Sequence, residues 1–286
     1  MLSLPRITGS EMFLTHVLPC DFLKSRVRFY RIIHFDFTKS PEAVNRVKYY
    51  RPRVEHCLQF TPFDSEAVDY IHQKSICNNM AVFGQQTVLS QRRLGSNFLN
   101  FQVVFRPGVF SSLFRVSADE FTNQYWDAGD VLDTEALFIN EQLAGCASYD
   151  DMVKVVERYL CRLVNRIKWK AHPVSAIAEH LYQPLARSLE WYADQANLSF
   201  RQFDRAFKYQ TGITPKDYRN LIRLDHAYLL KNRNPGKDGL TIALESGFYD
   251  YQHLAKVYKR YTGYGPGEFY ELEKKAPERS FGHYEK

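Results

Sequence analysis

The sequence repeats itself near its C-terminus with a period of about fifty residues. Residues 192–198 recur 50 positions later as residues 242–248, and beyond them the offset becomes 51. The matched positions downstream are Phe203 with Leu254, Arg205 with Lys256, Phe207 with Tyr258, Lys208 with Lys259, and Pro215 with Pro266. Each pair keeps its chemical class. Self-similarity at a fixed period means that one supersecondary unit is used twice, so the nature of that unit constrains the whole fold.

Each copy has the pattern of a helix, a tight turn, a second helix and a stop. Gly247 follows the first helix of the second copy, where a left-handed turn residue is needed and glycine has no Cβ to clash. Asn197 occupies the same position in the first copy and tolerates the same conformation. Gly212 and Gly263 stop the second helices. The pattern predicts two helix-turn-helix units, at about residues 189–212 and 240–263.

The second helix of each copy carries a polar face suited to DNA. Arginine and lysine pair with guanine edges or phosphates, glutamine reads adenine, and aromatic rings contact thymine methyl groups. The expected DNA-binding residues are Ser199, Arg201, Gln202, Arg205 and Lys208 in the first copy, and Tyr251, Gln252, His253, Lys256 and Lys259 in the second. A charged stripe on one helix is usually only solvated surface. Two matched copies favour DNA binding instead.

The distribution of charge agrees with this interpretation. The 286-residue chain has a net charge of +6, and residues 199–261 hold twelve Lys and Arg against six Asp and Glu. The excess of six within this segment equals the excess of the whole chain, so the remainder is balanced. A positive surplus confined to the repeat is the pattern expected of a phosphate-binding surface.

The repeat resembles the DNA-binding domain of the AraC/XylS transcriptional regulators. The second unit of that family reads I-A-x-x-x-G-F and ends F-K-x-x-x-G-x-x-P, which here are Ile242-Ala243 to Gly247-Phe248 and Tyr258-Lys259 to Pro266. The first unit's L-S-x-x-x-F-x-R-x-F-K is present from Leu198-Ser199 to Phe207-Lys208. Tyr192, Asn197 and Tyr264-Gly265 depart from the usual residues. The resemblance covers about residues 172–272.

The resemblance implies further features of the molecule. A linker helix at about residues 215–231 would join the two units and place their second helices in successive major-groove segments. Residues 1–170 would form a regulatory domain, often cupin-like in this family, that binds a small-molecule effector or forms a homodimer. Residues 171–286 would form the DNA-binding domain. Double-stranded promoter DNA and RNA polymerase would be the macromolecular partners.

The N-terminal part is rich in aromatic and β-branched residues that often alternate with polar ones, which predicts strands. We expect strands at residues 26–37, 53–60, 68–76, 80–89 and 98–105, and helices at 108–114, 118–123, 134–143 and 149–167. Ser148 is the expected cap of the last helix, whose apolar stripe ends at Ile167. The predicted fold class is α+β, a β-rich region with helices followed by an all-α double helix-turn-helix domain.

Several site classes are disfavoured by the sequence. The five cysteines are Cys20, Cys57, Cys77, Cys146 and Cys161; they are widely spaced, which favours reduced thiols in the cytoplasm. His16, His34, His56 and His72 are solitary and form no H-x-H pair, so we expect neither a metal site nor a cofactor. No uncharged apolar run is long enough to span a membrane.

Three questions stay open at this stage. A set of basic residues, Arg53, His56 and Arg106, could line a pocket for an anion, although surface or structural roles are commoner. The chain could be an enzyme or a reactive-cysteine sensor fused to a DNA-binding module, for which Pro19-Cys20-Asp21 offers only weak support. It could also be an architectural protein that binds DNA of any sequence. Our interpretation is a sequence-specific regulator without enzymatic activity.

Overall fold

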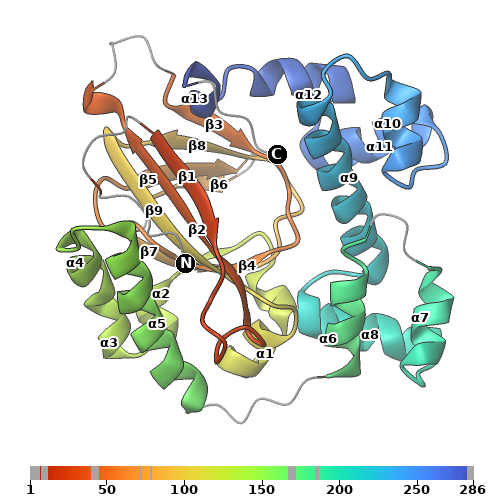
Figure 1. Ribbon diagram of the computed structural model, residues 1–286. Coiled ribbons are helices and arrows are strands. Elements are labelled where there is room, and N and C mark those ends of the chain that lie inside the picture. Colours follow the sequence, from red (N-terminus) through yellow and green to blue (C-terminus); the bar gives the residue numbers. More distant parts are fainter. Residues whose placement is uncertain are drawn as a thin grey trace.

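The computed structural model describes residues 7, 12–39, 45–70, 73–77, 79–166, 172–183 and 187–281. Within these residues a β-rich N-terminal region, up to residue 166, precedes a helical C-terminal region, from residue 172 (Figure 1). This order confirms the predicted α+β class.

The N-terminal region contains two antiparallel sheets. The six-stranded sheet has the order β1 (Met12–Val17), β2 (Val27–Asp36), β9 (Asn97–Phe105), β4 (His56–Phe60), β7 (Met80–Phe83) and β10 (Tyr125–Asp127). The four-stranded sheet has the order β3 (Val47–Tyr50), β8 (Ser90–Leu94), β5 (Glu66–Tyr70) and β6 (Gln73–Cys77). Neighbouring strands are therefore often far apart in sequence.

The central strands of the larger sheet have two different faces. Tyr30 and Ile32 of β2 belong to the main hydrophobic core. Arg31 lies between them and points to the opposite face because side chains alternate along a strand. There it pairs with Glu55 and donates to Gln102 Oε1 at 2.8 Å. One face of this sheet is therefore apolar, and the other carries buried charged and amide side chains.

Helices cover the apolar face (Figure 1). They are α1 (Val109–Phe114), α2 (Ala128–Val131), α3 (Thr134–Leu137), α4 (Ile139–Ala144) and α5 (Tyr149–Asn165), with the short 3-10 helix η2 (Ala118–Phe121). A second 3-10 helix, η1 (Phe37–Lys39), follows β2, and its Phe37 packs with Ile33 and Phe35 in a separate cluster. Ser148 caps α5, as predicted, by accepting from Asp151 N–H at 3.2 Å. Val156, Leu160 and Val164 of α5 are buried against the sheet, so this apolar stripe is used within the chain. Ile167 lies outside the described residues.

The structure corrects several predicted elements. The strand predicted at 68–76 is instead two strands, β5 and β6, which pair antiparallel with each other. The strand predicted at 80–89 stops at Phe83, and the helix predicted at 134–143 is divided into α3 and α4. Strands β1, β3, β8 and β10 were not predicted. Strand β8 was missed because most of its residues are polar or charged, which is not typical of a buried strand, yet its Arg92 is buried.

The C-terminal region is a bundle of short helices around a separate core. Its helices are α6 (Pro173–His180), α7 (Leu189–Gln195), α8 (Phe200–Thr211), α9 (Pro215–Arg233), α10 (Gly239–Glu245), α11 (Tyr251–Thr262), α12 (Pro266–Glu273) and α13 (Pro277–Ser280). All buried members of this core except Val54 and Leu89 come from residues 174–269. The helices thus supply nearly all of their own hydrophobic burial.

The two regions are joined by polar contacts of long sequence separation. They include Arg28 with Glu179 at 2.9 Å, Arg51 with Asp225 at 2.6 Å, the Tyr182 hydroxyl with Val54 O at 2.6 Å, and a buried ion pair of Lys48 with Glu278. The N-terminal region therefore contacts three helices of the helical region, namely α6 near its start, α9 in its middle and α13 near its end.

The cysteines whose side chains the structure describes are buried or partly buried free thiols. Cys57 is buried and Cys20, Cys146 and Cys161 are partly buried, all four as free thiols, whereas Cys77 lies in β6. Among the described residues, no group of three or more His, Cys, Asp or Glu side chains is placed to hold a metal ion. His72 falls outside them. No helix in the described ranges is both long and apolar enough to cross a membrane.

The buried His56 predicts how stability depends on pH. His56 is 2% exposed and stacks on Phe110, and burial lowers its pKa to about 3. The unfolded chain therefore takes up a proton at this side chain near pH 6.5, while the folded chain does not. Stability should fall as pH drops below 6.5, by up to about 1.4 kcal/mol per pH unit from this group. Urea unfolding between pH 5 and 7.5 should show a shallower dependence for His56→Gln, and equal dependence would contradict this assignment.

Candidate nucleic-acid interface

The first helix-turn-helix unit consists of α7 and α8. Asn197, in the turn between them, has a φ of 53°. Phe203 and Phe207 of α8 are fully buried and hold the helix against the rest of the unit. Ser199 caps α8 and forms a capping box with Gln202. The sequence therefore fixes the start of α8 by side-chain hydrogen bonds and fixes its orientation by an apolar stripe.

The second unit repeats this construction with α10 and α11. Gly247 has a φ of 78°, and Asp250 caps α11 by accepting from His253 N–H at 2.7 Å. Leu254 and Tyr258 of α11 are buried in the places that Phe203 and Phe207 take in α8. Gly212 and Gly263 end the two recognition helices, α8 and α11, with φ values of 88° and 80°.

The two units lie at opposite ends of α9 (Figure 1). This helix has 19 residues and ends at Arg233, slightly beyond the predicted end of the linker. At about 1.5 Å per residue its length is about 28 Å. Adjacent major-groove segments on one face of DNA are about 34 Å apart, so a helix of this length suits a spacer between two recognition helices.

The predicted DNA-binding side chains are mostly accessible. In α8, Arg201, Gln202, Arg205 and Lys208 are exposed, and in α11, Tyr251, Gln252, Lys256 and Lys259 are exposed. His253 is half-buried with its ring edge-on to Phe248. Each recognition helix thus presents a cluster of cations and amides on the side opposite its apolar stripe.

Two of these residues already have partners at the start of α8. The Ser199 N–H donates to Gln202 Oε1 at 3.0 Å, and the Ser199 hydroxyl donates to the same oxygen at 2.9 Å. A bidentate contact to adenine requires both the oxygen and the amide nitrogen of glutamine. Gln202 would therefore exchange these capping bonds for base contacts. Its role as a base reader stays a prediction.

The C-terminal end of α8 touches the N-terminal region. Lys208 forms an ion pair with Asp119 of η2 at 3.0 Å, and the Thr122 hydroxyl donates to Gly212 O at 2.9 Å. The Lys208 side chain is still 50% exposed. One predicted phosphate contact is therefore shared with an acidic side chain of the N-terminal region, which links that region directly to the first recognition helix.

This ion pair predicts a measurable effect on DNA affinity. Asp119→Asn should strengthen DNA binding, since Lys208 would no longer be paired with a carboxylate. Exposed ion pairs are worth at most about 1 kcal/mol, so the gain should not exceed about fivefold. Asp133→Asn is a matched control, because Asp133 pairs with Arg166 and not with a residue of α8. Fluorescence anisotropy at low salt would measure both, and unchanged or weaker binding by Asp119→Asn would contradict the proposed competition.

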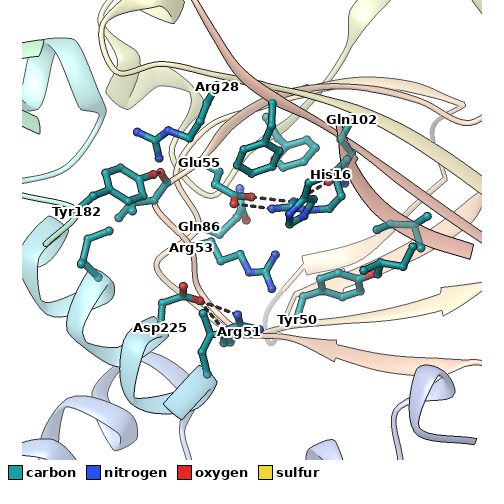
Figure 2. Close-up of a pocket in the computed structure, with 18 of the residues that line it drawn as sticks. His16, Arg28, Tyr50, Arg51, Arg53, Glu55, Gln86, Gln102, Tyr182 and Asp225 are labelled. Carbon is teal, nitrogen blue, oxygen red and sulfur yellow. Dashed lines mark hydrogen bonds and ion pairs between the residues drawn. The ribbon is translucent and has the colours of Figure 1, made fainter. Parts of the chain in front are cut away.

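Sequence reasoning missed the buried charges that lie between the two regions. Arg28, Arg31 and Arg51 were not singled out, although an arginine inside an alternating strand such as β2 is a detectable signal. A cavity lies between the N-terminal region and helices α6 and α9, and of the three basic residues considered above for an anion pocket only Arg53 lines it (Figure 2). His56 packs on Phe110, and Arg106 pairs with Glu179 at 3.3 Å.

The helical region matches a known domain family. Residues 192–271 match a family described as "Helix-turn-helix domain". The chain is 32% identical over 144 residues to the HTH-type transcriptional activator RhaS of Escherichia fergusonii, which is 50% of this chain and 47% of RhaS. It is 37% identical over 84 residues to the HTH-type transcriptional regulator MtrA of Neisseria gonorrhoeae, 28% of each chain. The chain thus spans about half or less of the length of these relatives.

The chain is also similar to two solved structures. An apo ToxT variant from Vibrio cholerae has a TM-score of 0.48 at 12% identity, covering 85% of this chain and 97% of that one. The DNA-binding domain of AdpA in complex with a target DNA has a TM-score of 0.32 at 24% identity, covering 36% of this chain and 95% of that one.

Proposed function

We infer that this chain is a member of the AraC family of transcriptional regulators and that it is a sequence-specific DNA-binding regulator of transcription. The observation that carries the proposal is the pair of recognition helices, α8 and α11. Both begin at a side chain that caps the helix by accepting from the backbone N–H three residues on, both bury an aromatic or aliphatic stripe, and both expose cations and amides. Two such helices joined by α9 form a reader of two neighbouring DNA segments.

The N-terminal region would modulate this activity. It contacts α8 through Asp119 and α9 through Arg51, so a change in the N-terminal region reaches both the first recognition helix and the linker. We propose that an effector or self-association acts through these contacts. Bound at a promoter in the cytoplasm, the protein would act on RNA polymerase.

The rival interpretation as a reactive-cysteine sensor has less support. Burial raises the pKa of the Cys57, Cys146 and Cys161 thiols, which disfavours the thiolate that such a sensor needs. We propose a regulator without enzymatic activity. Peptide mapping after treatment with a thiol-alkylating reagent would test this, because a sensor cysteine would react much faster than the others.

The proposed domain boundary near residue 171 gives a prediction. A fragment of residues 171–286 should fold alone and bind DNA, because its core is almost entirely its own. The logarithm of its affinity should fall with the logarithm of salt concentration, with a slope of about −0.9 per neutralised phosphate. Circular dichroism and anisotropy titrations between 50 and 300 mM salt would measure both, with the full chain as control. An unfolded fragment would refute the boundary, and salt-independent binding would refute the phosphate contacts.

A further inference from the structure

Two cysteine thiols lie against each other at the edge of the main hydrophobic core. Cys20 is in the loop between β1 and β2, and Cys161 is in the C-terminal half of α5. Both side chains are partly buried, and both pack against the core. The Cys20 thiol is hydrogen-bonded to the Cys161 thiol. The fold therefore brings together two thiols that are distant in the sequence.

Glu157 of α5 holds the loop beside Cys161. Its Oε1 accepts from the Cys20 backbone N–H at 2.7 Å, although Cys20 and Glu157 are 137 positions apart in the sequence. The same oxygen accepts from the buried Tyr30 hydroxyl at 3.2 Å. Glu157 and Cys161 are one helical turn apart, so their side chains lie on the same face of α5. The bond to Glu157 thus places Cys20 next to Cys161 independently of the contact between the thiols.

The backbone that carries each thiol is fixed. The Cys20 carbonyl accepts from Leu23 N–H at 2.9 Å and from Lys24 N–H at 3.2 Å, which closes a tight turn. Leu23 is fully buried in the main core and anchors that turn. Cys161 lies within a 17-residue helix. Little backbone freedom therefore remains to be lost when a bond joins the two side chains.

Cys57 and Cys146 have different surroundings. Charged groups, and not thiols, act on both of them. The Cys57 side chain is fully buried in β4, and the Cys146 thiol donates to Gln142 O at 3.3 Å. Among the cysteines whose side chains the structure describes, Cys20 and Cys161 are therefore the pair placed for a bond.

Two adjacent thiols can be joined by thiol–disulfide exchange. One thiolate attacks a sulfur of a small disulfide, RSSR, and forms a mixed disulfide while RS⁻ leaves. The other thiolate attacks the cysteine sulfur of that mixed disulfide, forms the new S–S bond and releases a second RS⁻. The two protons lost by the cysteines are taken up by the released thiolates. The chain dithiol is thus oxidised to a disulfide, and RSSR is reduced to two RSH.

We propose that Cys20 and Cys161 form a redox modification site, a dithiol that a low-molecular-weight disulfide such as glutathione disulfide oxidises to a reversible intramolecular disulfide. The bond would fasten the β1–β2 loop to α5. Its formation does not depend on DNA recognition.

This site differs from a fast-reacting sensor cysteine. Burial, and then the neighbouring Cys20 thiol, raise the pKa of the Cys161 thiol, so this thiol reacts slowly at neutral pH. The closing step is favoured by the fixed proximity of the second thiol and not by a stabilised thiolate.

Mass spectrometry of the full chain tests the site. The reduced protein is equilibrated at about pH 8 with about 1 mM each of reduced and oxidised glutathione, free thiols are alkylated, and the unreduced digest is mapped. Peptides linked through Cys20 and Cys161 should exceed mixed disulfides at these residues by at least about tenfold, and dithiothreitol should remove the link. Free thiols at both residues, mixed disulfides alone, or a predominant link to another cysteine would overturn the proposal.

Serine variants locate the bond. Cys20→Ser and Cys161→Ser should each abolish the link, and the remaining cysteine of the pair should stop at the mixed disulfide. Cys146→Ser is the matched control, because it removes another partly buried thiol, and it should form the link as wild type does. Alanine replaces serine if a serine variant does not fold. An undiminished yield of intramolecular link in Cys20→Ser or Cys161→Ser, or its loss in Cys146→Ser, would refute the assignment.

Thermal unfolding tests whether the two sulfurs are placed for a bond. A disulfide that closes a long loop without distorting the native geometry stabilises the folded chain. Oxidation should therefore raise the unfolding midpoint of the full chain by about 5 °C or more, and should not raise that of Cys20→Ser. An unchanged or lower midpoint after complete formation of the link would show that the bond requires a rearrangement, and would refute the placement of the pair.

Discussion

Replacing Gly247 by valine is expected to abolish sequence-specific DNA binding. Gly247 has a φ of 78°, in the left-handed region, at the turn between α10 and α11. A β-branched residue there costs about 1–2 kcal/mol or more, and the chain can relieve that strain only by changing the turn. The second recognition helix would then be misaligned. The N-terminal region, which has its own core, should keep its structure.

Gly267→Val is the matched control for this substitution. Gly267 lies within α12, is exposed, and a Cβ added to it would meet no atom within 4 Å. Valine is a better helix former than glycine, so this variant should be as stable as wild type or slightly more stable. Thermal unfolding and titration of a selected DNA site would compare the two. Wild-type affinity and stability of Gly247→Val would contradict the assignment of the turn.

Removing a base-reading side chain should relax the preferred DNA sequence at one position. Arg201 is exposed at the start of α8, and Gln252 is exposed at the start of α11. The first residues of a recognition helix are those that reach base edges. Arg201→Ala and Gln252→Ala should each cost about 1–3 kcal/mol of affinity for the preferred site and much less for unrelated DNA.

Lys259→Ala provides the contrast. Lys259 is exposed in the last turn of α11 and is expected to contact phosphate. Its loss should weaken binding to all sequences about equally and reduce the salt slope by about 1. Competition titrations with preferred and unrelated DNA would separate the two classes of residue. If Arg201→Ala and Gln252→Ala both kept the wild-type preference, the recognition assignment would be wrong.

The helical region was predictable because its helix starts, turns and buried faces are determined by residues that lie close together in the sequence. The capping residues Ser199 and Asp250, and the turn residues Asn197 and Gly247, act within a few positions of themselves. The spacing of Phe203 and Phe207 likewise shows which face of α8 is buried. These signals occur twice, so each copy supports the interpretation of the other.

The N-terminal region was harder because its determinants are distant in sequence. The partners of β2 are β1 and β9, and Lys48 pairs with a residue 230 positions away. Strand β8 has a polar sequence because Arg92 is buried by pairing with Glu66, which no local pattern reveals. The cavity follows from such long-range pairs. Of the three basic residues that the sequence suggested for an anion pocket, Arg53, His56 and Arg106, only Arg53 lines it.

A randomised-site selection with the full chain tests the central claim most directly. Sequence-specific recognition by α8 and α11 predicts one enriched bipartite site, whose two elements lie about one helical turn, roughly 10 base pairs, apart. Arg201→Ala should then degrade one element and Gln252→Ala the other. Enrichment of no sequence, with unrelated DNA competing as well as any selected site, would contradict the account and identify an architectural DNA-binding protein instead.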